Sequence, residues 1–263
     1  MDELIRLAPL AAAAVVGLMV VVWIVSVLVR DASIVDIVWG PGFVLVAAVA
    51  LIAGEGFAPR RALVMALVGT WGIRLGVHIA RRNLGKGEDR RYRAFRARWG
   101  ERFWWVSLFT VFLLQAVLML VVSLPILAAG AGRTPARLGW LDLAGTLVWA
   151  AGFAFESIGD AQLARFKRDP ANRGAVMDRG LWRYTRHPNY FGDALVWWGL
   201  GIIGLATPFG PWALIGPALM TFLLVRVSGV ALLERDIAER RPGYAEYVRR
   251  TSAFIPRPPK RER

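Results

Sequence analysis

The chain has 263 residues, of which 56% are hydrophobic, and it carries a formal net charge of +14 at pH 7 without any cysteine. The absence of cysteine excludes disulfides, thiolate metal sites and cysteine nucleophiles, and two histidines are too few for a histidine-rich metal cluster. Positive charge between membrane spans reports orientation and contact with lipid headgroups. We therefore expect membrane lipids as partners, and neither nucleic acid nor a metal.

Apolar segments long enough to cross a membrane recur along the chain. The first, Ala8 to Val29, carries no charge and exceeds the roughly 20 residues that a helix needs to cross the hydrocarbon. A signal peptide is the alternative, but no small-residue cleavage site precedes Arg30. The expected fold is all-α, one polytopic integral membrane domain over residues 1–263 with seven spans at 8–29, 33–53, 62–80, 105–129, 138–159, 190–206 and 212–233.

The connections differ in charge between the two sides of the membrane. Lys and Arg are abundant after the third and fifth spans and in the C-terminal tail, and sparse in the connections on the opposite side. Cytoplasmic loops are the ones enriched in Lys and Arg. This asymmetry predicts an N-terminus outside and a C-terminus in the cytoplasm.

The second span begins with a Ser-x-x-Asp pattern that has two interpretations. Ser33 and Asp36 can form a capping box, which satisfies the free amide groups of a helix start. Alternatively, Asp36 is a carboxyl group that burial keeps protonated and that donates to a substrate oxygen. Further along, residues 81–104 alternate charged and aromatic side chains, which is typical of an amphipathic helix in the membrane interface.

Ionisable residues recur at helical spacing inside the later spans. Arg74 and His78 share one face of the third span, where they either extend toward the interface or serve a function. Glu156 and Asp160 share a face at the end of the fifth span, where two acids oppose the helix dipole. We expect nearby arginines, or the hydroxyl and amide groups of a ligand, to compensate them.

The connection before the sixth span combines many arginines with Tyr184, His187 and Asn189. Arginine side chains bind phosphates through two parallel hydrogen bonds. A solvated cytoplasmic loop explains most of the charge, but it does not require these polar side chains among the arginines. Asp193 lies one turn beyond Asn189, where an acid also suits a helix N-terminus.

Residues Gly199 to Gly204 match the glycine pattern of dinucleotide-binding folds. That pattern requires a preceding strand and a helix N-terminus that faces the pyrophosphate. Here it lies inside an apolar span, so close packing of helices through small residues is the better interpretation.

The run from Gly180 to Asp193, with Trp197 one turn on, resembles the C-terminal domain of the steroid 5α-reductase family and of related bacterial membrane proteins. The resemblance extends to Asp160 through Lys167, to the tail around Tyr244, and more weakly to the third span around Arg74. Isoprenylcysteine carboxyl methyltransferases and sterol double-bond reductases share versions of the same core.

This resemblance implies a seven-span protein of the bacterial inner membrane that binds NADPH on its cytoplasmic side, with residues 160–263 as the cofactor-binding half. By match of motif, the implied cofactor-binding residues are Arg74, Asn83, Asp160, Lys167, Asn189, Asp193 and Trp197. Arg173, Tyr184 and His187 are added because of their chemistry and their proximity in sequence.

The resemblance also implies a catalytic acid in the second span and a tyrosine in the third. Asp36 corresponds to the acid, although the family's Gln-Glu-Leu-Pro motif is absent, and the tyrosine position aligns best with Trp71. Asp36 or His78 is then the expected proton donor.

The expected function is NADPH-dependent reduction of a C=C bond in a lipophilic α,β-unsaturated ketone, a 3-oxo-Δ4-steroid or similar molecule that enters from the bilayer. One alternative is a membrane methyltransferase of the isoprenylcysteine carboxyl type that uses S-adenosylmethionine. The other is a non-catalytic lipid-binding protein. No oligomeric state is predicted.

Overall fold

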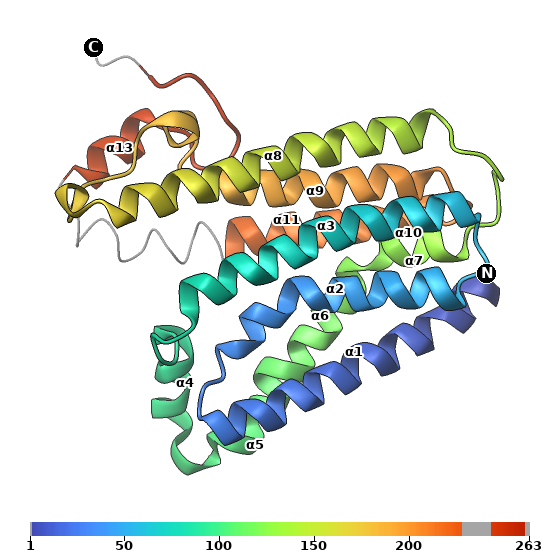
Figure 1. Ribbon diagram of the computed structural model, residues 1–263, viewed down its shortest axis with the longest axis horizontal. Coiled ribbons are helices and arrows are strands. Elements are labelled where there is room, and N and C mark those ends of the chain that lie inside the picture. The colour runs from blue at the N-terminus through green and yellow to red at the C-terminus, as the bar shows by residue number, and fades with distance from the viewer. Residues whose placement is uncertain (1, 228–242, 261–263) are drawn as a thin grey trace. The chain divides into compact units, whose positions relative to one another are not determined.

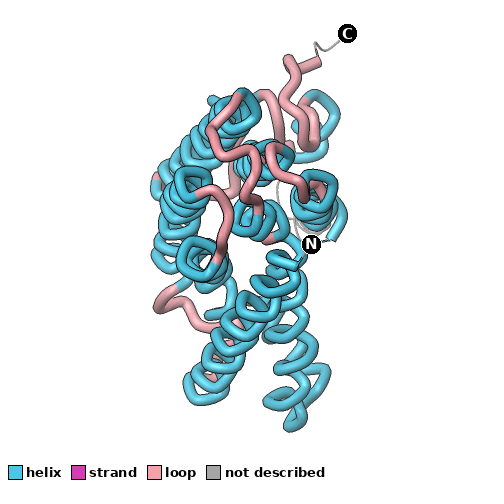
Figure 2. The backbone as a smooth tube through the Cα atoms, turned by 90° about the vertical axis from the view of Figure 1, so that its right-hand side faces the viewer, coloured by secondary structure: helices cyan, strands magenta, loops and turns pink. Residues whose placement is uncertain are grey.

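The computed structural model describes residues 2–227 and 243–260. Helices account for 79% of the structure, and the described part contains no strand (Figures 1 and 2). The extended pairing there is a single bridge between Thr185 and Ser252. The all-α expectation is confirmed.

The chain forms two compact units, Met1–Asp142 with Ile203–Gly216, and Leu143–Ile202 with Pro217–Arg263. The first unit contains α1 (Asp2–Val29), α2 (Ile34–Ala53), α3 (Ala58–Asn83), α4 (Arg90–Trp99), η1 (Gly100–Arg102), α5 (Phe103–Ser107), η2 (Leu108–Leu113), α6 (Leu114–Val122), α7 (Leu124–Ala131) and α10 (Gly210–Ala213). The second contains most of α8 (Trp140–Arg168) and α9 (Pro188–Leu205), and also η3 (Pro170–Asn172), η4 (Gly180–Arg183), α11 (Ile215–Phe222), η5 (Leu223–Val227) and α13 (Tyr244–Arg250).

Six helical segments in the described part are long and apolar enough to cross a membrane, which supports an integral membrane protein. They are Asp2–Val29, Ile34–Ala53, Ala58–Asn83, Arg90–Val122, Trp140–Arg168 and Gly210–Val227. The sixth predicted span forms helix α9 but is not among them, since its first turns carry polar side chains such as Asn189 and Asp193. The end of the seventh predicted span, residues 228–233, lies outside the described residues.

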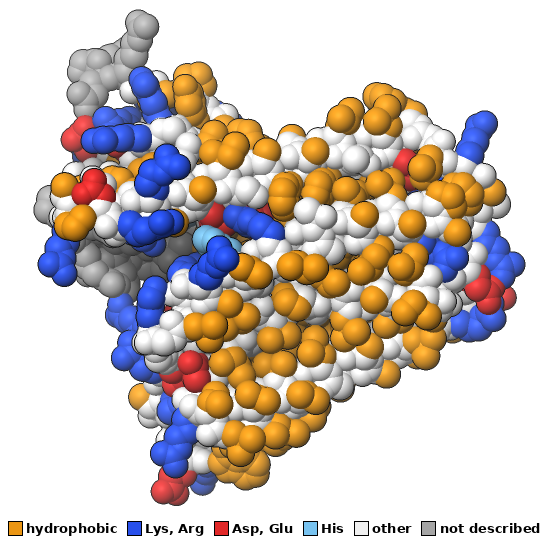
Figure 3. Space-filling model, in the orientation of Figure 1, with side chains coloured by type: hydrophobic (Ala, Val, Ile, Leu, Met, Phe, Trp, Pro, Cys, Tyr) orange, Lys and Arg blue, Asp and Glu red, His pale blue; other side chains and the backbone are white. Residues whose placement is uncertain are grey.

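The surface of the first unit suits a lipid environment. Along α1, Val21 is 57% and Leu28 is 77% exposed. Hydrophobic side chains cover much of the visible length of α1, α2 and α3, and charged side chains gather at the helix ends (Figure 3). An exposed apolar surface of this kind is stable in contact with acyl chains and unfavourable in water.

Helices α2 and α3 pack closely because glycines face one another. A Cβ atom on Gly40 would collide with the carbonyl oxygen of Gly72, and one on Gly72 would lie 2.6 Å from the carbonyl oxygen of Gly40. Small residues allow such close backbone approach between membrane helices. Buried Phe43 and Trp71 fill the space beside this contact, with ring centroids 5.8 Å apart.

A buried ion pair and two hydrogen bonds tie the start of α3 to the first turn of α8 and to the connection before it. The Arg60 and Asp142 side chains are 0% and 3% exposed, and Nε of Arg60 lies 2.7 Å from Oδ1 of Asp142. The same guanidinium donates to the carbonyl oxygens of Pro135 and Arg137, at 3.3 and 2.9 Å. The buried charge is therefore both paired and hydrogen-bonded, as burial of an ion requires.

Two boundaries differ from the sequence-based expectation. Helix α8 continues to Arg168, beyond the predicted end at residue 159, so Glu156 and Asp160 are interior positions rather than a helix C-terminus. The acid–dipole conflict expected there is wrong, and the actual last turn carries the cations that the dipole favours, Arg165, Lys167 and Arg168. In residues 81–104, a turn separates the end of α3 from α4, so the region is not one interfacial helix.

The glycine pattern at 199–204 lies within α9. A Cβ atom on Gly199 would lie 2.6 Å from the carbonyl oxygen of Gly145 and from the amide nitrogen of Trp149, both on α8. Gly152 and Gly192 make a similar close contact between the same two helices. These glycines therefore serve helix packing.

Candidate functional site

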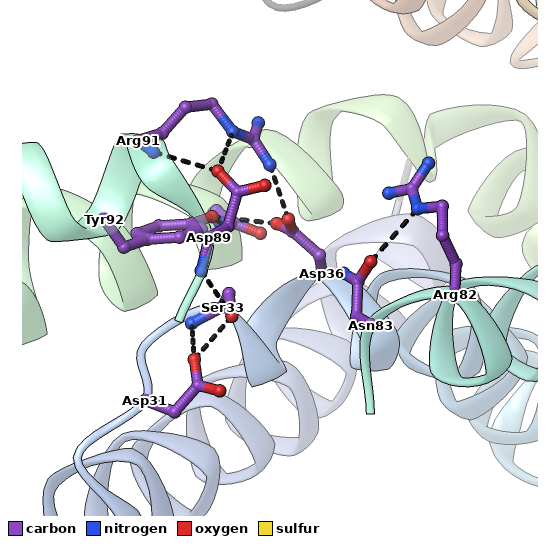
Figure 4. Close-up of polar contacts among 9 residues, drawn as sticks. Asp31, Ser33, Asp36, Arg82, Asn83, Asp89, Arg91 and Tyr92 are labelled. Carbon is purple, nitrogen blue, oxygen red and sulfur yellow. Dashed lines mark hydrogen bonds and ion pairs between the residues drawn. The ribbon is translucent and has the colours of Figure 1, made fainter. Parts of the chain in front are cut away.

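In the first unit, Asp36 lies in the first turn of α2 and accepts hydrogen bonds from two neighbouring residues of α4. Nη2 of Arg91 lies 2.6 Å from Oδ2, and the hydroxyl of Tyr92 lies 2.8 Å from Oδ1 (Figure 4). Tyr92 is 5% exposed, whereas the Arg91 side chain is 41% exposed. The carboxylate thus lies between a buried phenol and a cation that reaches solvent.

The connection from α1 to α2 holds α4 in this position. Ala32 donates its backbone N–H to Glu88 at 2.9 Å, and Glu88 accepts two further hydrogen bonds from Arg96, at 2.9 and 2.8 Å. Asp89 caps α4 by accepting from the Arg91 amide, and its own N–H donates to the Ser33 hydroxyl at 3.2 Å (Figure 4).

Ser33 therefore does not form the capping box with Asp36. Its hydroxyl donates to Asp31 and accepts from Asp89, and no side-chain cap is formed at the start of α2. The capping-box interpretation is wrong, because the Ser33 hydroxyl is hydrogen-bonded with Asp31 and Asp89 instead. The Asp36 carboxylate is consequently available to Arg91 and Tyr92.

The two acids of the connection between α3 and α4, Glu88 and Asp89, are held in their charged form. Burial would raise the pKa of Glu88, but the hydrogen bonds from Arg96 and Ala32 outweigh it and lower that pKa below its ordinary value. Burial opposes ionisation of Asp89 too, and the hydrogen bonds from Arg91 lower its pKa. Two ionised carboxylates thus anchor α4 at neutral pH.

Tyr92 is not among the site residues predicted from the sequence, because it lies in a charged connection outside the predicted spans. The Tyr92 hydroxyl donates to Asp36, and its oxygen accepts a hydrogen bond from Nε2 of Gln115 on α6 at 3.4 Å. One signal was available: an acid at the start of a membrane helix needs a partner, and residues 91 and 92 offer a cation and a phenol.

The remaining candidates of the first unit lie along α3. Arg74 and His78 are half-buried and one turn apart, as their spacing predicts. Asn83 is the last residue of α3, and its side-chain oxygen Oδ1 accepts a hydrogen bond from Nε of Arg82 at 3.1 Å (Figure 4). The side-chain nitrogen Nδ2 of Asn83 is buried and makes no hydrogen bond within the described residues, so it is an available donor.

In the second unit, Asp160 on α8 and Asn189 in the first turn of α9 form a polar pair. Nδ2 of Asn189 donates to Oδ1 of Asp160 at 3.1 Å, and Asp160 is 7% exposed. A Cβ atom on Gly159 would lie 3.2 Å from the backbone nitrogen of Asn189, so glycine at this position permits the close approach of α9 to α8. The Asn189 side-chain oxygen is buried and has no hydrogen-bond partner in the described part.

Asp193 and Trp197 continue the face of α9 that Asn189 begins, at successive spacings of four residues. Trp197 is fully buried. These three residues of the run therefore lie along one stripe of α9.

The loop before α9, residues 169–187, is held against α8 by two hydrogen bonds. The Trp182 indole donates to the Gly159 carbonyl oxygen at 3.0 Å, and the Leu181 amide donates to the Gln162 side chain at 3.0 Å. Gly180 adopts a positive φ of 59°, which favours glycine, and a Cβ atom there would collide with Gln162.

The C-terminal tail fastens the other side of this loop. Arg186 is 8% exposed and donates to the carbonyl oxygens of Val248 and Thr251, at 3.1 and 2.6 Å. It thereby caps the end of α13. Tyr247 donates its hydroxyl to the Trp182 carbonyl oxygen, and burial raises the pKa of Tyr247. Arg186 has a structural role that its place in a basic loop did not indicate.

The other predicted site residues of this unit differ in exposure. His187 is 4% exposed and stacks on Tyr190, with ring centroids 5.4 Å apart and ring planes 6° apart. Tyr184 is 44% exposed. Lys167 in the last turn of α8 and Arg173 after η3 are also exposed. The second unit thus combines a buried polar pair with cations at its surface.

Within the described residues, no group of three or more histidine, aspartate or glutamate side chains is arranged to hold a metal ion. The available chemistry is that of carboxylates, a phenol, amides and arginines.

Comparison with known proteins identifies relatives over most of the chain. Residues 22–251 match the family model described as "Protein of unknown function (DUF1295)", a family related to steroid 5α-reductase-like membrane proteins. A Schizosaccharomyces pombe protein described as uncharacterized is 27% identical over 270 residues, covering 90% of this chain and 76% of its own length. No solved structure matches the chain at a significant level. Because the family model covers most of its length, the chain belongs to the DUF1295 family.

Proposed function

We propose that this protein is an NADPH-dependent reductase of a C=C bond in a lipophilic α,β-unsaturated ketone, with Tyr92 and Asp36 as its proton-donating pair. The observation that carries the proposal is the 2.8 Å hydrogen bond between the buried Tyr92 hydroxyl and Asp36. The resemblance to steroid 5α-reductases leads us to expect an acid and a tyrosine acting together. Tyr92, rather than a residue of the third span, supplies the phenol.

The reaction places negative charge on the ketone oxygen. When bound, NADPH would be the source of the hydride that adds to the β-carbon, and the electrons of the C=C bond would then move toward the carbonyl group, which becomes an enolate. A hydrogen-bond donor aimed at that oxygen is most effective where water is excluded, as at the buried Tyr92. The α-carbon then takes a proton from water, the proton on the ketone oxygen returns to Tyr92, and the saturated ketone results.

Asp36 controls the direction in which the phenol donates. The Tyr92 hydroxyl carries one proton, which it donates to Asp36. In the proposed reaction, Asp36 takes up a proton and donates to Oη of Tyr92, which frees the phenol proton for the ketone oxygen. Arg91 is 41% exposed and can turn toward solvent when Asp36 becomes neutral.

The second unit contains groups that suit a dinucleotide. The buried Asn189 oxygen lacks a partner in the described part and can accept from an amide or a ribose hydroxyl, and the adjacent Asp160 carboxylate can accept a second such donor. Lys167 and Arg173 at the surface can face phosphates. These residues fit NADPH, and we propose that Tyr184, His187, Asp193 and Trp197 of the same unit complete its site.

Ligand-dependent stability of the purified protein in detergent tests this proposal. A ligand that binds the native state at 100 times its dissociation constant stabilises it by about 2.7 kcal/mol. We expect NADPH to raise the unfolding temperature, NADH to do so less, and S-adenosylmethionine to have no effect.

The two alternatives give different results in the same experiment. Stabilisation by S-adenosylmethionine alone would identify a methyltransferase. Stabilisation by none of the three would favour a lipid-binding protein. For the reductase, consumption of NADPH with a 3-oxo-Δ4-steroid or another lipophilic enone completes the test.

A further inference from the structure

A basic cavity lies in the second unit, between the loop before α9 and the C-terminal tail. It has a volume of about 630 Å³, and its charged lining residues are Asp178, Arg179, Arg183, Arg250 and Lys260. Four cations thus face one carboxylate. None of the residues predicted to bind the cofactor lines it.

Two segments that are far apart in the sequence form the walls. The Lys260 amide donates to the Arg250 carbonyl oxygen at 3.0 Å, which returns the tail alongside the end of α13. The Arg257 amide donates to the Tyr184 carbonyl oxygen at 2.9 Å, which holds the tail against the loop. Nη2 of Arg250 lies 2.5 Å from Oδ2 of Asp178, which joins α13 to the start of the same loop. Backbone and ion-pair contacts therefore shape the cavity.

The cations of the cavity are unequally neutralised. Arg250 is paired with Asp178 at 2.5 Å and with Glu246 at 3.7 Å. The side chains of Arg179, Arg183 and Lys260 make no hydrogen bond and no ion pair with any residue that the structure describes. Like charges gathered in one concavity repel one another and attract a counter-ion.

We propose that this cavity binds the phosphate group of a ligand other than the cofactor. A phosphate presents several strong acceptor oxygens and up to two negative charges, and two arginines with a lysine supply matching donors. Other basic residues at this end of α8, such as Arg165 and Arg168, do not line this cavity, so an orientation signal accounts for them but not for the convergence of Arg179, Arg183 and Lys260. The phosphate belongs either to a phospholipid headgroup or to a soluble phosphorylated molecule.

Calorimetric titration of the full-length protein in detergent tests the proposal with one probe for each source. Dioctanoyl phosphatidate represents the headgroup, with phosphate-free dioctanoylglycerol as its control, and inorganic pyrophosphate represents a soluble phosphate. We expect Arg183→Gln and Lys260→Gln each to weaken binding of the preferred probe roughly tenfold or more, the effect of losing one charge-assisted hydrogen bond. Arg249→Gln is the matched control, because Arg249 is an exposed arginine of α13 that does not line the cavity.

Each outcome decides a separate point. Binding of phosphatidate alone assigns a lipid headgroup, and binding of pyrophosphate alone assigns a soluble ligand. Failure of both probes to bind, or equal weakening by Arg249→Gln, overturns the proposal. Loss of probe binding in saturating NADPH overturns the separation from the cofactor. If one variant does not fold, Arg179→Gln replaces it. NADPH affinity, measured on the same variants, should stay unchanged and reports on the reductase proposal independently.

Discussion

Replacing Tyr92 with phenylalanine tests the proposed proton donor. The substitution removes one oxygen and keeps the ring, which is 5% exposed and packs beside Phe95 with centroids 6.4 Å apart. The lost hydrogen bonds are those to Asp36 at 2.8 Å and from Gln115 at 3.4 Å. Removing a hydrogen bond to a charged group costs about 1.5–3 kcal/mol, so we expect the variant to fold with lower stability.

The catalytic effect of Tyr92→Phe should be much larger than this stability loss. General acid catalysis contributes roughly 10²-fold or more, and the donation strengthens as the enolate forms. We therefore expect kcat to fall by at least that factor with NADPH affinity nearly unchanged. Steady-state kinetics with an enone substrate and a separate NADPH binding curve measure the two quantities.

Tyr247→Phe is the matched control, because Tyr247 is also a buried tyrosine whose hydroxyl is hydrogen-bonded, here to the Trp182 carbonyl oxygen. It should lose stability and keep kcat. Asp36→Asn should lower kcat as Tyr92→Phe does, since asparagine cannot pass a proton to the phenol. Full activity in Tyr92→Phe would refute the assignment of Tyr92, and full activity in Asp36→Asn as well would leave His78 as the remaining candidate acid.

Four further predictions concern stability, pH, cofactor and topology. Arg60→Ala should destabilise the protein by about 3–5 kcal/mol in thermal unfolding, because its buried carboxylate partner is left uncompensated. Since the pKa of Glu88 is lowered from 4.5, its stabilising effect is complete above pH 4.5 and is lost as pH falls through the folded-state pKa. Glu88→Gln should therefore reduce the acid sensitivity of unfolding, and an unchanged pH profile would contradict this. Asn189→Ala should weaken NADPH binding by about 1–3 kcal/mol, measured by titration, and equal affinity would remove it from the site. A cysteine at Arg173 should be protected from impermeant thiol reagents in intact cells and one at Arg133 labelled, whereas the reverse pattern would invert the topology.

The apolar pattern predicted the helices because a chain in hydrocarbon must satisfy its backbone hydrogen bonds within each segment. The predicted span 33–53 agrees with α2 (Ile34–Ala53), and the end of the first span agrees with α1. The end of α8 was missed because hydropathy marks only the part of a helix that suits lipid, and the helix continues to Arg168.

Several predicted site residues lie close together in the motif around Asn189, so the sequence alone predicted that they are neighbours in the fold. Helix periodicity places Asn189, Asp193 and Trp197 on one face wherever the helix packs. The hydrogen bond from Asn189 to Asp160 required more, namely that α9 starts against Gly159.

Only the tertiary structure joined Asp36 to Tyr92 and assembled the basic cavity. Both depend on chain segments that fold back: α4 is held by contacts of Glu88 and Asp89 with the α1–α2 connection, and the tail returns through the contact of Lys260 with Arg250. Periodicity and composition report which face of a helix is apolar. They do not report which distant residue meets a charged side chain, because that depends on the directions of turns set by hydrogen bonds between remote parts of the chain.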